Sequence, residues 1–254
     1  MKGAELDFSG KVALVTGGSR GIGKGVSLAL AERGARVMIC GRKEEILRSA
    51  SRELKELGYE VLAFPANVGK SDQVKALMEY LDKQFGKLDI LVNNVGMNIL
   101  TPSIIDSDEG LWDKVIETNL KGPYLVTKEA VRLIRKAGAG RVINISSIAA
   151  RKATMGMGIY CIAKAGLEML TRVLAVELAQ ERINVNAIAP SMVKTGFSKF
   201  FWGNESLLPE ITRMVPMGRI AEVEDVVGCV LFLASELSRF VTGETITVDG
   251  GSMA

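Results

Sequence analysis

Apolar residues along the chain fall into short runs of strand length that alternate with longer stretches of helical periodicity. The pattern predicts strands at 11–16, 36–40, 61–66, 88–92, 141–145, 183–188 and 245–248, and helices at 21–33, 44–57, 71–85, 109–137, 160–179 and 223–234. Strands that alternate with helices are typical of a parallel sheet covered by helices on both faces. We therefore predict an α/β fold of the Rossmann type, with a doubly wound, mostly parallel seven-stranded sheet.

Residues 1–254 contain no repeat, low-complexity tract or flexible linker, which predicts a single domain. Between Pro190 and Met217 the periodic pattern weakens, and the sequence SKFFW at 198–202 places aromatic residues between two glycines. Long irregular connections next to strand ends are usually functional. Residues 191–217 are therefore either a mobile lid over the substrate or an ordinary surface helix packed on the domain, and the sequence leaves both open.

Composition restricts the possible partners. The chain is 48% hydrophobic and 24% charged with a net charge of +3, so no strong field favours nucleic acid or an anionic membrane. No apolar run approaches a membrane span, and residues 1–9 lack the apolar core of an export signal. Three widely spaced cysteines form no metal or disulfide pattern. We expect a cytoplasmic protein in a reducing environment.

The chain contains no histidine. This excludes the catalytic triads that depend on histidine and most zinc sites, and we predict no metal site. Acid–base chemistry must then use tyrosine, lysine, cysteine or carboxylate side chains.

The segment TGGSRGIG at 16–23 lies directly between the first predicted strand and the first predicted helix. Gly17, Gly21 and Gly23 allow a tight turn and a close approach of the backbone, while the helix N-terminus offers free N–H groups. A generic glycine-rich turn has a similar composition. The position between strand and helix nevertheless favours a site for the pyrophosphate of a dinucleotide.

The end of the second strand bears on the choice between NAD and NADP. An acidic residue there accepts a hydrogen bond from the ribose 2′-hydroxyl and repels a 2′-phosphate. Gly41 occupies that position, Arg42 follows it, and Arg20 lies in the glycine-rich turn. Each arginine alone is consistent with a solvated surface residue, but the two guanidinium groups and the missing acid together favour NADP(H).

Tyr160 and Lys164 lie one helical turn apart. A neighbouring ammonium favours the phenolate, so we expect Lys164 to lower the pKa of Tyr160 and allow proton exchange with a carbonyl or alcohol oxygen. The pair alone is common on solvated helix faces. Ser147 strengthens it by following a strand at the edge where parallel sheets bind ligands, with Ser146 as the competitor for its role.

These motifs together resemble the short-chain dehydrogenase/reductase family. The resemblance rests on TGGSRGIG (16–23), NNVG (93–96), Asn119 in ETNLKG, the serines 146–147, YCIAK (160–164), APSMVKT (189–195) and the closing TGETITVDGG. These stretches follow the family's order and spacing over nearly the whole chain.

The resemblance implies a role for each matching residue. Ser147 would orient the substrate oxygen, Tyr160 would be the acid/base, Lys164 would bind the ribose and tune Tyr160, and Asn119 would support a water-linked proton relay. Cofactor contacts would come from Gly17, Ser19, Arg20, Gly21, Ile22, Gly23, Arg42, Asn67, Val68, Asn94, Gly96, Tyr160, Lys164, Val193 and Thr195.

Three positions depart from the family pattern. Val95 replaces the usual alanine in a packed turn, and Asn67 replaces the commoner aspartate beside the expected adenine. Ser191 replaces the usual glycine after Pro190, which should stiffen the start of the 191–217 segment.

Two substrate classes remain open within this resemblance. Stretches such as VGKSDQ (68–73) and KTGFSKFFW (194–202) are similar to carbonyl reductases, with Phe197, Phe200, Phe201 and Trp202 as candidate pocket walls or, equally, core or interface residues. The 3-oxoacyl-(acyl-carrier-protein) reductases dock their acidic partner with two arginines, and Gly138 and Glu181 occupy those positions here, although Arg182 is adjacent. We therefore expect an NADP(H)-dependent carbonyl reductase that acts on a ketone or aldehyde, with apolar or aromatic ketones as the preferred substrates.

A protein that binds the cofactor without catalysis is the alternative from another class, although the catalytic set is intact. The family commonly forms tetramers, so the resemblance implies a homotetramer, with no nucleic-acid or membrane partner.

Overall fold

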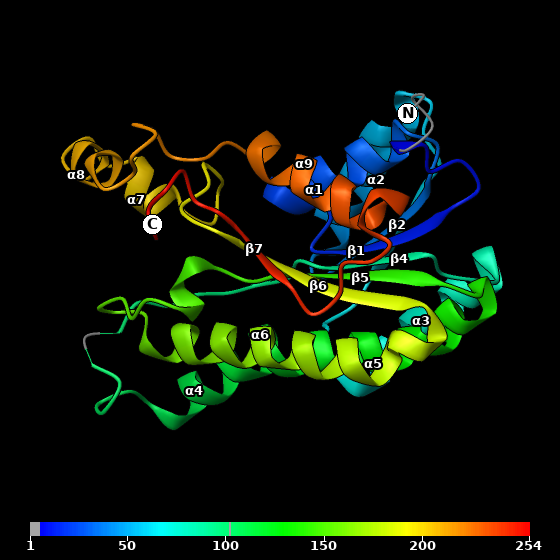
Figure 1. Cartoon of the computed structure of the whole chain (residues 1–254), viewed down its shortest axis with the longest axis horizontal. Coiled ribbons are helices and arrows are strands. Elements are labelled where there is room, and N and C mark those ends of the chain that lie inside the picture. The colour runs from blue at the N-terminus through cyan, green and yellow to red at the C-terminus, as the bar shows by residue number, and fades with distance from the viewer. Residues whose placement is uncertain (1–5, 102) are drawn as a thin grey trace.

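The computed structural model describes residues 6–101 and 103–254. Its seven strands form one sheet in the order β3-β2-β1-β4-β5-β6-β7, and each pairing between them is parallel (Figure 1). The predicted doubly wound α/β fold is therefore confirmed. Residues 1–5, which belong to the segment expected to lack an export signal, lie outside the described residues.

The elements follow the predicted alternation closely. The strands are β1 (Val12–Thr16), β2 (Arg36–Gly41), β3 (Val61–Pro65), β4 (Ile90–Asn93), β5 (Gly140–Ile145), β6 (Ile183–Pro190) and β7 (Thr245–Val248). The main helices are α1 (Gly21–Ala31), α2 (Glu44–Glu56), α3 (Ser71–Phe85), α4 (Glu109–Ile116), α5 (Gly122–Ala137), α6 (Gly158–Leu178) and α9 (Val223–Ala234).

The sheet is buried on both faces because its strands are apolar on both. Ala13 and Val15 of β1 pack into one core with α1, α2 and α9, whereas Val12 and Leu14 pack into the other core with α3, α5 and α6. Figure 1 shows these two helical layers on opposite sides of the strands. Successive side chains of a strand alternate between faces, so a continuous apolar run fills both cores.

The chain order changes direction beside β1. Strands β2 and β3 lie on one side of β1 and β4 to β7 on the other, which creates the switch point where such sheets bind ligands. The glycine-rich turn leaves β1 at this edge, residues 94–96 leave β4, and Ser146 and Ser147 leave β5. The predicted site residues therefore meet at the carboxyl edge of the sheet.

The helix predicted over 109–137 is interrupted. Five residues between α4 and α5 form a π-helical turn, η2 (Glu117–Lys121), which contains Asn119. Pro123 follows within the first turn of α5 and lacks the N–H that would donate to the carbonyl of Asn119 in a regular α-helix. The missing donor at Pro123 is compatible with this wider turn, which the periodicity did not reveal.

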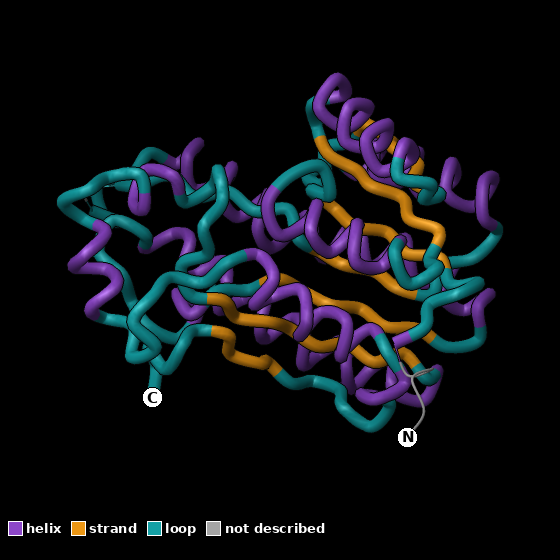
Figure 2. The backbone as a smooth tube through the Cα atoms, turned by 90° about the horizontal axis from the view of Figure 1, so that it is seen from above, coloured by secondary structure: helices purple, strands orange, loops and turns teal. Residues whose placement is uncertain are grey.

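The 191–217 segment contains two short helices, α7 (Lys199–Trp202) and α8 (Leu208–Arg213). It extends to one side of the strands and lies beside the C-terminus in both views (Figures 1 and 2). It is thus neither fully irregular nor one packed surface helix. Over 6–101 and 103–254, no helix is both long and apolar enough to span a bilayer.

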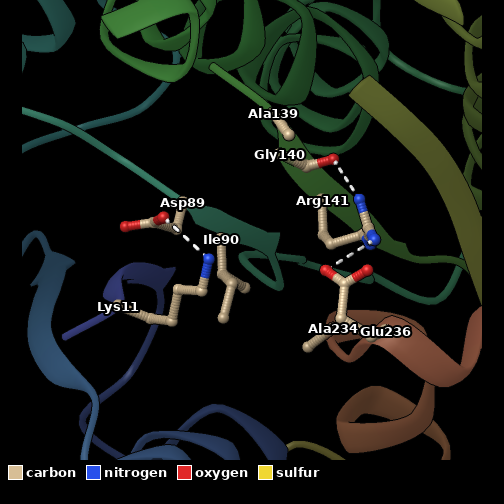
Figure 3. A pocket seen from close by; sticks show the side chains of 8 residues that line it. All are labelled: Lys11, Asp89, Ile90, Ala139, Gly140, Arg141, Ala234 and Glu236. Carbon is tan, nitrogen blue, oxygen red and sulfur yellow. Dashed lines mark hydrogen bonds and ion pairs between the residues drawn. The ribbon is translucent and has the colours of Figure 1, made fainter. Parts of the chain in front are cut away.

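The amino edge of the sheet holds charged side chains that contact one another (Figure 3). Arg141, only 7% exposed, donates to the side-chain oxygen of Asn184 at 3.0 Å and to Glu236 at 3.2 Å. Asp89, 5% exposed, accepts the main-chain N–H of Val12 at 2.9 Å. Arg141 thus joins the start of β5 to the start of β6 and to Glu236, and Asp89 joins the residue before β4 to the start of β1.

Candidate active site

The glycine-rich turn is packed too closely for side chains. Gly17 and Gly21 have φ angles of 66° and 52°, which favour glycine. A Cβ added to Gly23 would lie 2.3 Å from the carbonyl oxygen of Gly17, and one added to Gly18 would lie 2.5 Å from Ile39. The turn therefore requires glycine at several positions.

Helix α1 begins directly after this turn. Arg20 is its N-cap residue, but no side chain caps the helix and its first turn contains no acidic residue. The N-terminal N–H groups and the positive end of the helix dipole are thus left for an anion, which fits the predicted pyrophosphate.

Asn94 connects β4 to the glycine-rich turn. Its side-chain amide donates to the carbonyl of Thr16 at 2.9 Å, and its main-chain N–H donates to the Thr16 hydroxyl at 2.9 Å. The structure thus shows Asn94 holding the turn, while its predicted contact with the cofactor stays a prediction. Thr16 was absent from the predicted set, although a polar residue at a buried strand end was a signal for it.

Arg20 and Arg42 are both exposed at the carboxyl edge, and neither forms an ion pair within the described part of the chain. Gly41 has ordinary space around it, since an added Cβ would meet only Leu47 at 3.8 Å. No steric requirement therefore explains why a glycine replaces an acidic side chain at the end of β2.

Asn67 and Val68 lie in the turn after β3. The side-chain oxygen of Asn67 accepts the N–H of Gly69 at 3.1 Å, and its main-chain N–H donates to Gln73 at 2.7 Å. Val68 is 3% exposed and would block a side chain on Gly122. These residues therefore shape the turn, and their contact with adenine stays a prediction.

Tyr160 projects from the first turn of α6 and is 9% exposed. Burial raises the pKa of Tyr160 to about 12, and the nearby Ser147 hydroxyl opposes that rise. Ser147 caps the short helix η3 (Ile148–Ala150) by accepting the N–H of Ala149 at 3.2 Å, which leaves its hydroxyl proton free to be donated. Ser146 instead donates to Glu168 at 3.3 Å, so Ser147 is the serine that faces the tyrosine.

Lys164 is 3% exposed, and its Nζ donates to the carbonyl of Ile145 at 2.8 Å. The nitrogen lies 5.6 Å from the centre of the Tyr160 ring. Burial lowers the pKa of Lys164 to about 8. The expected lowering of the Tyr160 pKa by Lys164 is not found in this structure, where burial has the largest effect on the pKa of Tyr160 and the Ser147 hydroxyl is the group that lowers it.

Asn119 is fully buried in the π-helical turn. Its side chain donates to the carbonyls of Met97 at 2.8 Å and Val115 at 2.9 Å, and it accepts the N–H of Met97 at 3.1 Å. Gly96 lies beside it, since an added Cβ would be 3.3 Å from the Asn119 oxygen and 3.8 Å from Lys164. Asn119 and Lys164 are thus both brought close to Gly96.

Val193 and Thr195 start the 191–217 segment. Val193 is 6% exposed and pairs with Ala221 in an isolated parallel bridge. Thr195 packs against Gly21, whose added Cβ would lie 3.2 Å from the threonine methyl. The segment predicted to contact the nicotinamide therefore lies against the glycine-rich turn.

Two side chains of the aromatic segment hold these residues. The Trp202 indole donates to the carbonyl of Thr195 at 2.8 Å, and the Ser198 hydroxyl donates to the carbonyl of Val193. Phe197 lies beside Tyr160, with ring centres 6.5 Å apart. Phe197 and Phe200 are 56% and 68% exposed, so the alternative of packing in the core of the chain is wrong for both.

Comparisons with known proteins agree with this geometry. A family model described as enoyl-(acyl carrier protein) reductase matches residues 17–253. Human dehydrogenase/reductase SDR family member 4 is 38% identical over 96% of this chain and 88% of its own length. The 3-oxoacyl-[acyl-carrier-protein] reductase of Chlamydia muridarum is 37% identical over 95% of this chain and 96% of its own length.

The chain belongs to the short-chain dehydrogenase/reductase family.

Solved members of this oxidoreductase family have nearly the same fold. A putative gluconate dehydrogenase from Agrobacterium tumefaciens has a TM-score of 0.94 at 32% identity, with 98% of each chain covered. A gluconate 5-dehydrogenase from Burkholderia cenocepacia, solved with NADP and tartrate, has a TM-score of 0.93 at 30% identity, covering 98% of this chain and 97% of its own.

One further feature of this short-chain dehydrogenase/reductase was not predicted. Glu168 is a carboxylate only 4% exposed, one turn after Lys164, and it pairs with Arg151 at 3.0 Å. Acidic residues are rarely buried without a partner, but the sequence does not reveal which surface of α6 is covered.

Among the residues that the structure describes, no group of three His, Cys, Asp or Glu side chains is arranged to hold a metal ion.

Proposed function

We propose that this short-chain dehydrogenase/reductase is an NADP(H)-dependent carbonyl reductase, which interconverts a ketone or aldehyde with an alcohol. The observation that carries the proposal is the grouping of Tyr160, Ser147 and Lys164 at the carboxyl edge of the sheet. The three side chains come from α6 and from the segment that follows β5, and they meet beside the turn that fits a pyrophosphate.

In this reaction the Ser147 hydroxyl would donate a hydrogen bond to the substrate oxygen, keep its own proton and hold the carbonyl beside the phenol. Tyr160 would then give its proton to the same oxygen as the alcohol forms. The bound nicotinamide would supply the hydride. Because burial keeps Tyr160 protonated, the phenol is suited to act as a donor, which favours carbonyl reduction near neutral pH.

Lys164 and Asn119 would support the transfer. Lys164 uses one of its three N–H donors on the carbonyl of Ile145, so two remain for ribose hydroxyls. The Asn119 side chain bonds both the N–H and the carbonyl of Met97. It would keep that segment fixed beside a water-linked proton relay.

The preference for NADP(H) is supported by charge. Arg20 and Arg42 lie at the expected side of the ribose without carboxylate partners among the described residues, and Gly41 provides no acid to repel a 2′-phosphate. The Burkholderia relative was solved with NADP, in agreement with this preference.

An apolar or aromatic ketone is the proposed substrate class. Phe197 supports it most directly, because its exposed ring lies beside Tyr160 where a substrate would enter. Phe200 and Phe201 contact each other edge to face at 5.2 Å and continue the apolar wall, and Trp202 fixes that wall to Thr195.

A 3-oxoacyl-(acyl-carrier-protein) reductase is the second candidate, supported by the Chlamydia relative. Its docking arginines are poorly replaced here. Gly138 has a φ of 80°, where an arginine would be strained, and Glu181 is paired with Arg135 at 2.5 Å. Arg182, adjacent to Glu181, could replace one of these arginines.

A substrate panel tests these proposals. Purified protein would be mixed with NADPH or NADH and with aromatic ketones, aliphatic ketones, a 3-oxoacyl thioester and oxidised gluconate, and loss of the reduced nicotinamide would be followed by absorbance. We expect turnover with NADPH and the highest kcat/KM with an aromatic ketone. Highest activity with the thioester would favour the second candidate, and binding without turnover would indicate a non-catalytic protein.

The exposed face of α6 supports the expected homotetramer. Ile162, Met169, Val173 and Val176 form an apolar stripe on this helix, and Val176 is 81% exposed. Light scattering coupled to size exclusion would test the assembly. The three free cysteines are consistent with the proposed cytoplasmic location.

A further inference from the structure

Glu168 is a buried carboxylate that the proposed reaction does not use. It lies on α6, two turns after Tyr160 and one turn after Lys164, and is 4% exposed. Its Oε2 accepts from the Arg151 guanidinium at 3.0 Å, and its Oε1 accepts from the Ser146 hydroxyl at 3.3 Å. Arg172 lies at the limit of ion-pair distance, 4.0 Å away.

These contacts hold both sides of Ser147. The residue before Ser147 is held through the hydroxyl of Ser146, and Arg151 closes the short helix η3 that Ser147 opens. One turn earlier on α6, Lys164 holds the carbonyl of Ile145. Helix α6 therefore carries the tyrosine and also fixes the main chain that carries the serine.

Arg151 extends the connection to the edge strand. Besides Glu168, its guanidinium donates to the Thr247 hydroxyl at 3.2 Å and to the carbonyl of Thr245 at 3.4 Å. The side chain thus joins η3, α6 and β7. Loss of its carboxylate partner would leave a cation with only neutral acceptors and Ser146 without its buried acceptor.

We propose that Glu168, together with Arg151, is a positioning residue that holds the Ser147 hydroxyl against the Tyr160 phenol. The proposal rests on the proposed function, because it assigns Glu168 to the same proton-transfer site. Glu168 contacts no reacting atom; it acts through Ser146, Arg151 and the η3 turn.

A positioning role of Glu168 and a purely electrostatic effect of its charge predict opposite shifts of the Tyr160 pKa in the Glu168→Gln variant. Lys164, one turn earlier on α6, has no carboxylate partner among the described residues, and the cations beside Glu168 are Arg151 after η3 and Arg172 on α6. Removing the carboxylate leaves them uncompensated, so charge alone would lower the pKa of Tyr160. Displacing Ser147 would raise that pKa instead, because the serine hydroxyl opposes the effect of burial.

The experiment measures alcohol oxidation by the NADP⁺-loaded enzyme across alkaline pH, for the wild type and for Glu168→Gln and Arg151→Met. We expect kcat/KM to fall by roughly tenfold to a hundredfold in both variants, as small misplacements of reacting groups do, with cofactor affinity nearly unchanged. The apparent pKa of the alkaline rise should increase in both. A lower apparent pKa in Glu168→Gln, or wild-type kcat/KM in both variants, would overturn the proposal.

Asp89→Asn is the matched control. Asp89 is equally buried, contacts two lysines and one neutral donor, and lies at the opposite edge of the sheet. We expect it to lower the melting temperature without moving the alkaline rise. An equal shift in this control would show that the pH profile reports general loosening of the fold.

Hydrogen exchange at the Ala149 amide keeps the test independent of turnover. This amide donates to Ser147, so exchange should accelerate in Glu168→Gln and Arg151→Met and stay unchanged in Asp89→Asn. A wild type without turnover on any carbonyl would overturn the proposed function, while unchanged exchange in both variants would overturn the positioning role.

Discussion

Three basic side chains at the amino edge of the sheet and three at its carboxyl edge differ in what they contact. Lys11 and Lys87 pair with Asp89 at 3.4 and 3.0 Å, and Arg141 pairs with Glu236 at 3.2 Å. At the carboxyl edge, Arg20, Arg42 and Lys164 form no such pair with any carboxylate of 6–101 or 103–254. Paired cations join elements of the fold, whereas unpaired ones are left available to an anion or polar ligand.

Lys164 shows this difference most clearly, because a buried ammonium without a counter-charge is costly. Its pKa is lowered to about 8 because burial disfavours the charged form. Burial also lowers the pKa of Arg141, but the charge of Glu236 opposes that effect. The fold thus accepts an electrostatic penalty at one edge and compensates for a similar burial at the other.

Tyr160→Phe should have the largest effect of any single change at the carboxyl edge. It removes only the transferred proton, so we expect kcat to fall by roughly 10²–10⁴-fold while NADPH affinity and the free energy of unfolding change little. Stopped-flow turnover and fluorescence titration with NADPH would measure the two quantities. Retention of wild-type kcat would exclude Tyr160 as the proton donor.

Replacing Lys164 and Arg141 by methionine should separate function from stability. Lys164→Met should reduce turnover and NADPH affinity, while the free energy of unfolding of the cofactor-free protein stays equal or rises, since an uncompensated charge leaves the core. Arg141→Met should keep kcat but lose about 1–3 kcal/mol of stability through its unpaired acceptors. Urea unfolding and steady-state kinetics of both variants test this. Similar losses of kcat in both would contradict the assignment of Lys164 to function and Arg141 to stability.

The pH dependence of the free energy of unfolding also tests whether the Lys164 ammonium is buried without a counter-charge. The pKa of Lys164 falls from 10.5 to about 8 on folding, so the folded chain binds fewer protons than the unfolded chain between these values. The free energy of unfolding should therefore rise with pH across this window, by at most about 3 kcal/mol relative to Lys164→Met. Tyr160 acts in the opposite direction, but only between its ordinary pKa of 10.0 and its raised pKa of about 12. Urea titrations of both proteins at about pH 7 and about pH 10 would reveal the difference, and parallel curves would contradict it.

Arg42→Ala should have the smallest effect. Loss of a charge-assisted bond to a 2′-phosphate should weaken NADPH binding by about 1.5–3 kcal/mol and leave NADH binding nearly unchanged. Calorimetric titration with both nucleotides measures this, with Arg132→Ala on the helical face of α5 as an exposed-arginine control. Equal weakening for both nucleotides would argue against a 2′-phosphate site.

Sequence reasoning predicted α3, α9 and β7 with their observed bounds, because their periodicity ends at clear polar or glycine signals. It missed the break at η2, where the apolar pattern continues through the π-helical turn and only Pro123 marks the change. The local hydrophobic pattern thus predicts where helices and strands lie, but it does not predict irregular turns within them.

The site shows a similar division. Motif spacing predicted that Tyr160, Lys164 and Ser147 would meet at one edge of the sheet, as observed. The direction of the Tyr160 pKa was not predictable, because it depends on how deeply the phenol is buried. The Glu168–Arg151 pair was also missed, since the two residues form no motif and meet only through the packing of η3 on α6.

The bonds from Trp202 and Ser198 to the carbonyls of Thr195 and Val193 have a consequence for the order of binding. The aromatic wall and the segment expected to hold the nicotinamide are one continuous piece of chain, so we expect α7 to move together with that segment. We therefore expect a compulsory-order steady-state mechanism, in which the nucleotide binds first and leaves last. Product inhibition would then be competitive between the two nucleotide forms and non-competitive between nucleotide and alcohol.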